Sequence, residues 1–305
     1  MTGFTALRLL DARRLRALAL AAGVDPVDAV PRRDTPPDAD LLDLTADPFD
    51  DVADVFDRLR ELERRLRSAG DRRAVFLTIY TRMTAAVRDA IDAGRFADGP
   101  WMRRYTVTFA DHYRRAFDAF ERGRLSAVPD PWLVAFGTAR AGDALVAQDA
   151  FLGINAHINY DLALALHEIG IDPNRHRKRA DHDEIDAVLT DLIDAQQAAL
   201  TDLYAPGLAD VDATLGPVDE ALSLFSMTEG RAQAWRLATV LTDASWLFVR
   251  RCARWLLRAT AVGGAVVTRS PPLDSTLLAA LRRVERGVDL ETMLTQLAAR
   301  LDGVD

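Results

Sequence analysis

The stretch from Gly142 to Gly170, GDALVAQDAFLGINAHINYDLALALHEIG, constrains the fold more than any other part of the chain. It is long and mostly apolar, which predicts a buried helix of several turns. It also carries amide, imidazole and carboxylate side chains, which are uncommon in core helices. Burying such groups costs free energy unless they find partners. We therefore expect a central helix whose polar side chains are paired with one another or face a polar cavity.

These polar side chains leave the helix on two nearly opposite faces, since successive residues are rotated by about 100°. The two sets are Gln148, Asn155 and Asn159 on one face, and His157, Asp161 and Glu168 on the other. Residues four apart, such as His157 and Asp161, can touch on the helix surface. We interpret six such groups in one helix as a functional pocket. The alternative is an internal hydrogen-bond network that fixes the packing of neighbouring helices.

The rest of the chain predicts an all-α fold, because strand patterning is almost absent. Helices are predicted at about 47–70, 74–93, 101–123 and 183–204, in a run from 226 that could continue unbroken to 261, and as two short helices within 273–301. The predicted architecture is a single large helical bundle, residues 47–272, around one buried central helix at about 142–170. Residues 1–46 are predicted to form a peripheral helical arm with a Pro-rich linker, and residues 273–305 a C-terminal helical extension.

Composition narrows the classes of partner. The hydrophobic content of 49% suffices for a real core, and the net charge of −8 disfavours non-specific binding to nucleic acid or to an anionic membrane surface. Cys252 is the single cysteine, which excludes a disulfide framework. Arginines interrupt the N-terminal apolar residues, unlike a signal peptide, and no apolar run reaches membrane-spanning length. The sequence therefore predicts a cytoplasmic protein, and gives no indication of its oligomeric state.

The central motif resembles a known family. The pattern G-x-N-A-H-I-N-x-D-L, from Gly153 to Leu162, is similar to the hallmark of a prokaryotic family of unknown function. Weaker matches flank it, and together they span about residues 44–272. These matches are Tyr80 to Thr84, Phe109, Tyr113, the segment 183–189, Arg231, Ala234 and Trp235. The chain has Asp186 where we expect the family to carry Asn. The resemblance implies where a site lies, and it implies no activity.

We first consider an enzyme that acts on a small or lipid-like molecule. His157 would serve in acid–base chemistry or as a metal ligand, with Asp161 as its partner, while Asn155 and Asn159 hold a substrate oxygen or a water. The candidate substrate-binding residues are Gln148, Tyr80, Thr84, Tyr113, Arg231, Trp235 and Glu168. We expect no cofactor, because His157 and Asp161 supply only two of the three or more protein ligands that a tight zinc site needs. Zn²⁺ at His157 and Asp161, or Mg²⁺ at Asp50, Asp51 and Asp54, stays open as an alternative.

Two further functions stay open. Asp50, Asp51 and Asp54 form a D-D-x-x-D pattern, which terpene synthases use to hold Mg²⁺ and an isoprenoid diphosphate. Aspartates in a first helical turn also cap free backbone N–H groups, and we find no second acidic motif. The other alternative is a non-catalytic ligand-binding or scaffold bundle in which the polar helix is purely structural. The position of the three aspartates relative to His157 separates these hypotheses.

Overall fold

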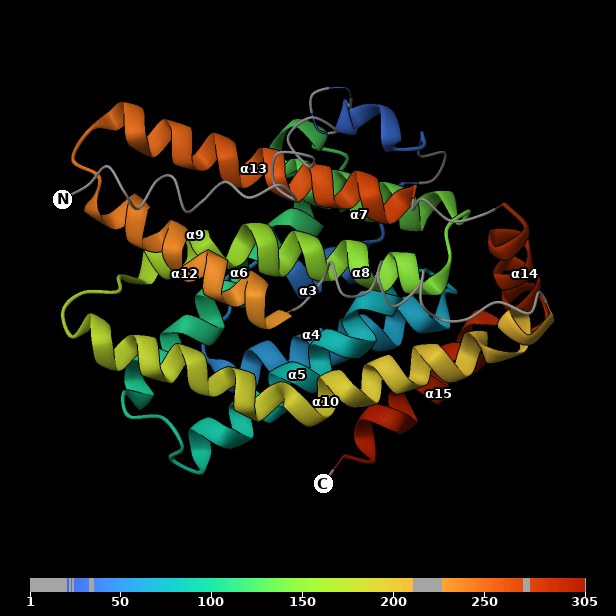
Figure 1. The fold of residues 1–305 in the computed structure, drawn as a ribbon, viewed down its shortest axis with the longest axis horizontal. Coiled ribbons are helices and arrows are strands. Elements are labelled where there is room, and N and C mark those ends of the chain that lie inside the picture. The colour runs from blue at the N-terminus through green and yellow to red at the C-terminus, as the bar shows by residue number, and fades with distance from the viewer. Residues whose placement is uncertain are drawn as a thin grey trace.

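The computed structural model describes residues 21, 23, 25–32, 36–210, 227–270 and 275–304. Every regular element in these ranges is a helix and none is a strand, which confirms the predicted all-α fold (Figure 1). Within the described ranges, no helix combines the length and the apolar composition needed to cross a membrane. The helix predicted for the N-terminal arm lies outside the described residues, apart from Ala21.

The elements are named in chain order. They are η1 (Pro26–Ala29), α3 (Ala39–Thr45), α4 (Val52–Ser68), α5 (Ala74–Asp92), α6 (Gly99–Glu121), η2 (Leu125–Ala127), α7 (Asp130–Ala141), α8 (Val146–Ala156), η3 (His157–Asp161), α9 (Leu162–Ile169), α10 (Arg175–Asp210), α12 (Met227–Asp243), α13 (Leu247–Arg269), α14 (Ser275–Arg286) and α15 (Leu290–Asp302). Elements η1 and η2 are 3₁₀-helices, and η3 is a π-helix.

Elements α8, η3 and α9 run on from one another as the predicted central helix. It begins at Val146 rather than at Gly142, because Gly142 ends α7 in the left-handed conformation, with φ 70°. Gly170, with φ 78°, follows its last residue. The central helix contacts α5, α6, α7, α12 and α13, and it lies in the middle of the view in Figure 1. Its neighbours on so many sides explain why its sequence lacks a solvent face.

Two helix boundaries differ from the sequence prediction. Helix α10 begins at Arg175, before the predicted start of this helix at 183, and it includes the basic residues that precede Asp183. The prediction of one unbroken helix from 226 to 261 is wrong, because α12 ends at Asp243 and α13 begins at Leu247. The chain turns back at this point, and α13 then packs on α7, α8, η3 and α12. Burial of one face of α13 against these helices favours the turn, although no Gly or Pro marks it.

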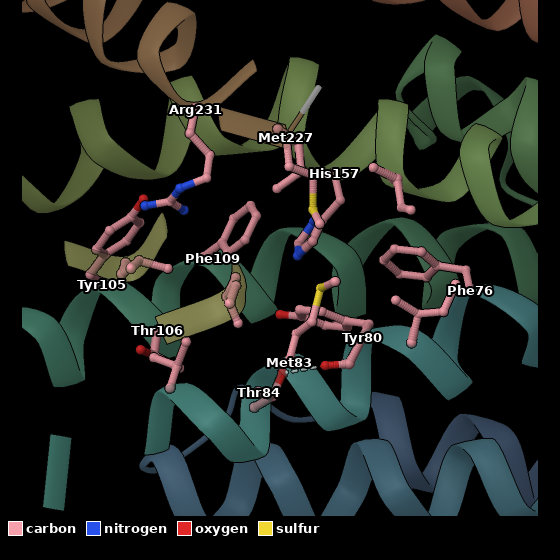
Figure 2. A pocket seen from close by; sticks show the side chains of 16 residues that line it. Phe76, Tyr80, Met83, Thr84, Tyr105, Thr106, Phe109, His157, Met227 and Arg231 are labelled. Atoms are coloured by element: carbon pink, nitrogen blue, oxygen red, sulfur yellow. Dashed lines mark hydrogen bonds between the residues drawn. The ribbon is translucent and has the colours of Figure 1, made fainter. Parts of the chain in front are cut away.

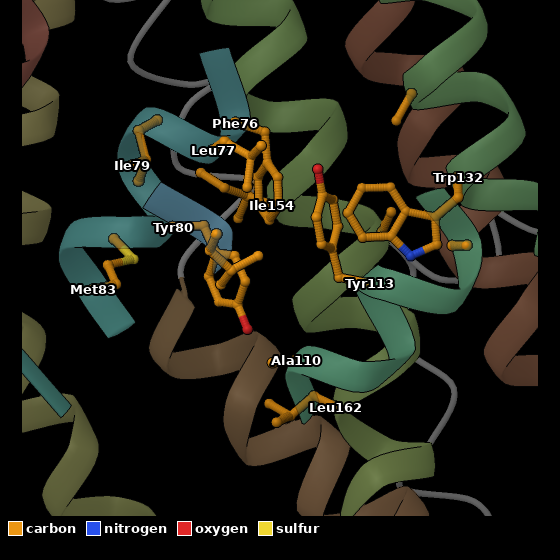
Figure 3. Packing of buried hydrophobic residues seen from close by; sticks show 14 of the residues in the cluster. Phe76, Leu77, Ile79, Tyr80, Met83, Ala110, Tyr113, Trp132, Ile154 and Leu162 are labelled. Atoms are coloured by element: carbon orange, nitrogen blue, oxygen red, sulfur yellow. The ribbon is translucent and has the colours of Figure 1, made fainter. Parts of the chain in front are cut away.

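Aromatic side chains fill the core between α5, α6, α7 and the central helix. In Figure 3 the rings of Phe76, Tyr113 and Trp132 lie in succession, and the centroid of the Phe76 ring is 5.5 Å from Tyr113 and 5.4 Å from Trp132. Gly153 lets Phe76 approach the central helix, because a Cβ atom at that position would lie 2.5 Å from the ring. The core therefore reaches the backbone of the central helix on this side.

Amide side chains on the other side of the central helix hold α13 in place. The Gln148 Nε2 group donates to the carbonyls of Thr268 and Arg269, at 2.8 Å and 3.0 Å. These two carbonyls belong to the last turn of α13, where helix carbonyls lack partners within the helix. Gln148 therefore caps the C-terminal end of α13.

Asn155 makes the second contact of this amide seam, which comprises Gln148, Asn155 and Asn159. Its Nδ2 group donates to the carbonyl of Ala261 at 2.8 Å, and its Oδ1 accepts from Asn159 Nδ2 at 3.0 Å. Gly264 on α13 leaves the necessary room, because a Cβ atom there would lie 2.6 Å from Asn155 Oδ1. The polar face that carries the amides is thus a satisfied helix–helix contact.

The amide seam predicts a strong coupling between Gly264 and Asn155. Gly264→Ala should destabilise the protein. The added methyl group overpacks the contact at a cost of about 1–3 kcal/mol, which exceeds the roughly 1 kcal/mol of helix stability that alanine gains over glycine. In the Asn155→Ala background the clash is absent, so the same substitution should be neutral or stabilising by up to about 1 kcal/mol. Thermal and urea unfolding of the two single variants and the double variant measure this coupling. Equal effects of Gly264→Ala in both backgrounds would contradict the close approach.

Candidate functional site

His157 and Asp161 form a hydrogen-bonded pair within the π-helical turn η3. The backbone N–H of Leu162 donates to the carbonyl of His157, five residues earlier, as a π-helix requires. His157 Nδ1 lies 3.0 Å from Asp161 Oδ2, and both side chains are buried. Short π-helical segments within α-helices frequently occur at functional sites. The contact that the spacing of these two residues predicted is therefore present in the structure.

Trp132 on α7 completes this group from a second helix. Its indole Nε1–H donates to the same oxygen, Asp161 Oδ2, at 2.8 Å. When ionised, Asp161 can only accept hydrogen bonds, so the proton between the pair lies on His157 Nδ1. The imidazole then has an unprotonated Nε2. This nitrogen is buried and has no hydrogen-bond partner in the described structure, and neither has Asp161 Oδ1.

Burial shifts the titration of both members of the pair. Removal from water raises the pKa of Asp161 to about 7, although the positive potential of His112, the hydrogen bond from Trp132 and the charge of Arg115 favour the carboxylate. The same removal lowers the pKa of His157 well below its usual value. The imidazole is therefore neutral at pH 7, where its Nε2 can accept a proton. Because the two groups are in contact, they titrate as a pair.

An aromatic pocket opens beside His157 (Figure 2). Its cavity volume, counted as the space that the centre of a water-sized sphere can reach, is about 70 Å³. Its walls come from α5, α6, α8, η3, α10 and α12 and are mostly apolar. The lining residues are Phe76, Ile79, Tyr80, Met83, Thr84, Val87, Tyr105, Thr106, Phe109, Ile154, His157, Ile158, Ile185, Leu189, Met227 and Arg231. Such a pocket suits a small apolar molecule with few polar groups.

Two rings fix the plane of the imidazole. Phe109 stacks on His157 with 3.6 Å between ring centroids and 9° between planes, and Tyr80 meets it edge-on at 4.5 Å. Figure 2 shows the three rings around the same cavity. Burial also raises the pKa of Tyr80 far above its usual range, so its hydroxyl stays protonated. The imidazole is therefore held by rings on α5 and α6 and by the carboxylate on its own helix.

Only four of the predicted site residues line this pocket: His157, Tyr80, Thr84 and Arg231. The Thr84 hydroxyl donates to the carbonyl of Tyr80 at 2.8 Å, which leaves the wall largely apolar. Arg231 is buried, and its Nε donates to Asp186 Oδ1 at 2.6 Å. Asp186 thus orients Arg231 at one end of the pocket.

The other predicted residues lie behind the pocket or away from it. Asp161 acts through His157, and the buried hydroxyl of Tyr113 has no hydrogen-bond partner in the described structure. Gln148, Asn155 and Asn159 form the amide seam on the opposite face of the central helix. Trp235 packs against His182, and Glu168 is exposed and pairs with His112 at 3.1 Å. The predicted set therefore divides into two networks and a surface contact.

Three residues of the site were not predicted from the sequence. They are Trp132, His182, and Phe109 in its role as the ring that stacks on His157. Trp132 and Phe109 lie in helices rich in apolar residues, and nothing in the local pattern marks them as partners of His157. His182 Nδ1 lies 2.9 Å from the Tyr105 hydroxyl, and its Nε2 lies 3.1 Å from the carbonyl of Arg231. His182 therefore connects α6, α10 and α12 at the Arg231 end of the pocket.

The three aspartates of the D-D-x-x-D pattern lie outside the pocket. Asp51 caps α4 by accepting from the backbone N–H of Asp54 at 2.9 Å. Asp54 accepts from the backbone N–H of Asp50 and pairs with Arg58, each at 3.0 Å. None of the three lines the wall beside His157. Across the described ranges, no three His, Cys, Asp or Glu side chains are grouped so that they could hold a metal ion.

The raised pKa of Asp161 predicts a pH dependence of stability. Its pKa is about 7 in the folded protein and about 3.9 in the unfolded chain, so the folded state binds more protons between these values. The contribution of Asp161 to stability is therefore lost as the pH rises from about 4 to 7. Asp161→Asn lacks this titration. The free energy of unfolding of Asp161→Asn minus that of the native protein should therefore rise as the pH rises from about 4 to 7, by up to about 1.4 kcal/mol per pH unit.

Urea unfolding of both proteins at several pH values measures this difference. The buried Asp149, whose pKa is also raised to about 7, is present in both proteins and cancels in the comparison. A difference that does not change with pH, or that falls as the pH rises, would show that Asp161 is ionised in the folded protein throughout.

Comparisons with known proteins identify a family for this chain. Neither the curated proteins nor the solved structures contain a match to this chain. The model of a family of unknown function, DUF5995, matches residues 52–269, from the start of α4 to the end of α13. This range includes the central helix and every residue that lines the pocket. The chain belongs to the family of unknown function DUF5995.

Proposed function

We propose that this chain is an enzyme that binds a small, mostly apolar molecule in the aromatic pocket and uses His157 Nε2 as a general base. One observation carries the proposal: Nε2 is buried beside the pocket without a hydrogen-bond partner among the described residues, while Nδ1 is fixed by Asp161. A buried acceptor without a hydrogen bond costs about 1–3 kcal/mol. A bound molecule that presents an O–H, N–H or acidic C–H group to Nε2 would remove this cost.

The partners of His157 suit proton transfer. A carboxylate behind an imidazole selects one tautomer and stabilises the imidazolium that forms when Nε2 takes up a proton. Here the Trp132 indole holds the carboxylate in turn, so the base is oriented through two side chains. The stacked ring of Phe109 and the edge of Tyr80 prevent the imidazole from turning away.

The residues of the pocket wall favour a mechanism in which His157 removes a proton from the substrate or from a water beside it. They do not favour nucleophilic attack on the substrate by a side chain of the protein. Thr84 and Thr106 are the residues of the pocket wall that carry an aliphatic hydroxyl group. Each hydroxyl donates a hydrogen bond to a backbone carbonyl one helical turn earlier. His157 itself uses Nδ1 for Asp161, so only Nε2 remains for a substrate or a ligand. Arg231 supplies a positive charge at the other end of the pocket.

A probe reaction tests the base without knowledge of the natural substrate. The probe 5-nitrobenzisoxazole is a small flat molecule that loses one C–H proton to a base, and its N–O bond then breaks to give a coloured cyanophenolate. The native protein should accelerate this ring opening, and His157→Gln should lose roughly ten-fold or more of the rate, since positioned bases contribute about 10²–10⁴. His176→Gln is the matched control, because His176 is exposed near the start of α10 and lies outside the pocket lining.

The pH dependence of the probe reaction tests whether His157 and Asp161 act together. The rate should rise with an apparent pKa of about 7 as Asp161 ionises and makes Nε2 more basic, and Asp161→Asn should lose this transition. Equal rates for the native protein and His157→Gln at every pH would contradict the proposal. Saturable binding of the probe without turnover would instead favour a ligand-binding protein.

A further inference from the structure

The first turn of α13 exposes an unusual set of apolar side chains. The exposed fractions are 74% for Trp246, 63% for Leu247, 73% for Phe248, 41% for Val249 and, two turns later, 58% for Trp255. Among the described residues, the one other large hydrophobic side chain of this kind is Val27, at 46%. Folded proteins bury most such residues, and a contiguous exposed group marks a surface that meets a partner.

The position of this turn limits the kind of partner. The turn between α12 and α13 lies at one end of the molecule, at the left of Figure 1. Residues 246–249 are consecutive, so their side chains point to all sides of the helix axis. A protein partner covers one face of a helix, whereas a membrane interface can surround a projecting turn. Tryptophan, leucine and phenylalanine are also the residues that enter the headgroup region of a bilayer.

Arginines follow directly after the exposed turn. Arg250, Arg251 and Arg254 lie in the first two turns of α13, at the positive end of the helix dipole, where cationic side chains are unfavourable. Arg250 contacts His167 Nε2 at 3.3 Å, and neither Arg251 nor Arg254 forms an ion pair with a described residue.

The acidic groups on the neighbouring helices have other partners. Asp243 at the end of α12 pairs with Arg175 at 2.6 Å, and Glu168 on α9 faces His112 and Arg115. Farther along α13, Arg258 pairs with Asp130. A chain of net charge −8 therefore presents, beside exposed aromatic side chains, a small group of arginines without an acidic partner among the described residues. The overall charge argued against an anionic membrane, but this surface is a local exception.

We propose that residues 246–255 form a membrane-docking tip that binds the surface of bilayers containing anionic phospholipids. Trp246, Leu247 and Phe248 enter the boundary between headgroups and acyl chains, and Arg251 and Arg254 contact lipid phosphates. The tip lies on the surface and does not cross the bilayer. Helix α12, which ends at the tip, begins at Met227 of the pocket wall, so the tip and the pocket lie at opposite ends of this helix. The proposal stands independently of the chemistry assigned to His157.

Tryptophan fluorescence reports docking directly. The chain has five tryptophans, of which Trp101, Trp132 and Trp235 are buried, so a change on binding comes from Trp246 and Trp255. The probes are vesicles of phosphatidylglycerol mixed with phosphatidylcholine, and vesicles of phosphatidylcholine alone. The full chain should sediment with the anionic vesicles, its emission should shift to shorter wavelength, and raised salt should weaken the binding. Binding to the neutral vesicles should be weaker by roughly ten-fold or more.

Two double variants separate the contribution of the apolar side chains to membrane binding from that of the arginines. Trp246→Ser with Phe248→Ser should abolish the spectral shift and the binding, and Arg251→Glu with Arg254→Glu should weaken binding to anionic vesicles by roughly ten-fold or more. Arg104→Glu, which changes an exposed arginine on α6, is the matched control and should bind as the native chain does. All these residues are exposed, so the melting temperatures should stay close to native.

Failure of the native chain to bind anionic vesicles would overturn the proposal. So would binding that is unchanged in the Trp246→Ser and Phe248→Ser variant. If the native chain is instead a dimer in gel filtration and this variant is a monomer, the tip is an interface between two copies, and the membrane proposal is wrong.

Discussion

One carboxylate oxygen, Asp161 Oδ2, accepts hydrogen bonds from two elements at the centre of the protein. The donors are Trp132 on α7 and His157 on the central helix, at 2.8 Å and 3.0 Å. Because the group is buried, the bonds that stabilise its negative charge also decide how the imidazole is oriented. The π-helical turn supplies the backbone for this contact, and the rings of α5 and α6 close around it. The pocket beside Nε2 follows from this arrangement.

The central helix separates structural and chemical tasks onto two faces. On one face, the amide seam satisfies its hydrogen bonds against α13, with Gly264 providing the space. On the other face, His157 and Asp161 each keep a buried atom that has no hydrogen-bond partner in the part of the chain that the structure describes. Satisfied buried polar groups specify packing, whereas unsatisfied ones reduce stability and persist where function requires them. Substitutions on the two faces should therefore differ in kind, with loss of packing on one and loss of chemistry on the other.

Much of this arrangement could be predicted from residue spacing. The apolar stretch with few charges predicted the central helix, and the spacing of His157 and Asp161 predicted their contact. Spacing alone could not show that Asn155 contacts the backbone of α13, because the same amide could equally face a cavity. The turn between α12 and α13 carries no Gly or Pro, and it depends on burial of α13 against the rest of the bundle. Trp132 and Phe109 meet His157 only through tertiary packing, which a single sequence does not contain.

The protonation of His157 is the central claim, and nitrogen-15 NMR of the imidazole measures it most directly. Long-range proton–nitrogen correlation spectra of the native protein, assigned by comparison with His157→Gln, give the chemical shifts of both ring nitrogens. The account predicts a neutral ring at pH 7, with the proton on Nδ1 and an unprotonated Nε2. The ring should stay neutral below pH 6.5, the usual pKa of the side chain. A protonated Nε2 at pH 7, whether in the other tautomer or in the imidazolium, would contradict the account.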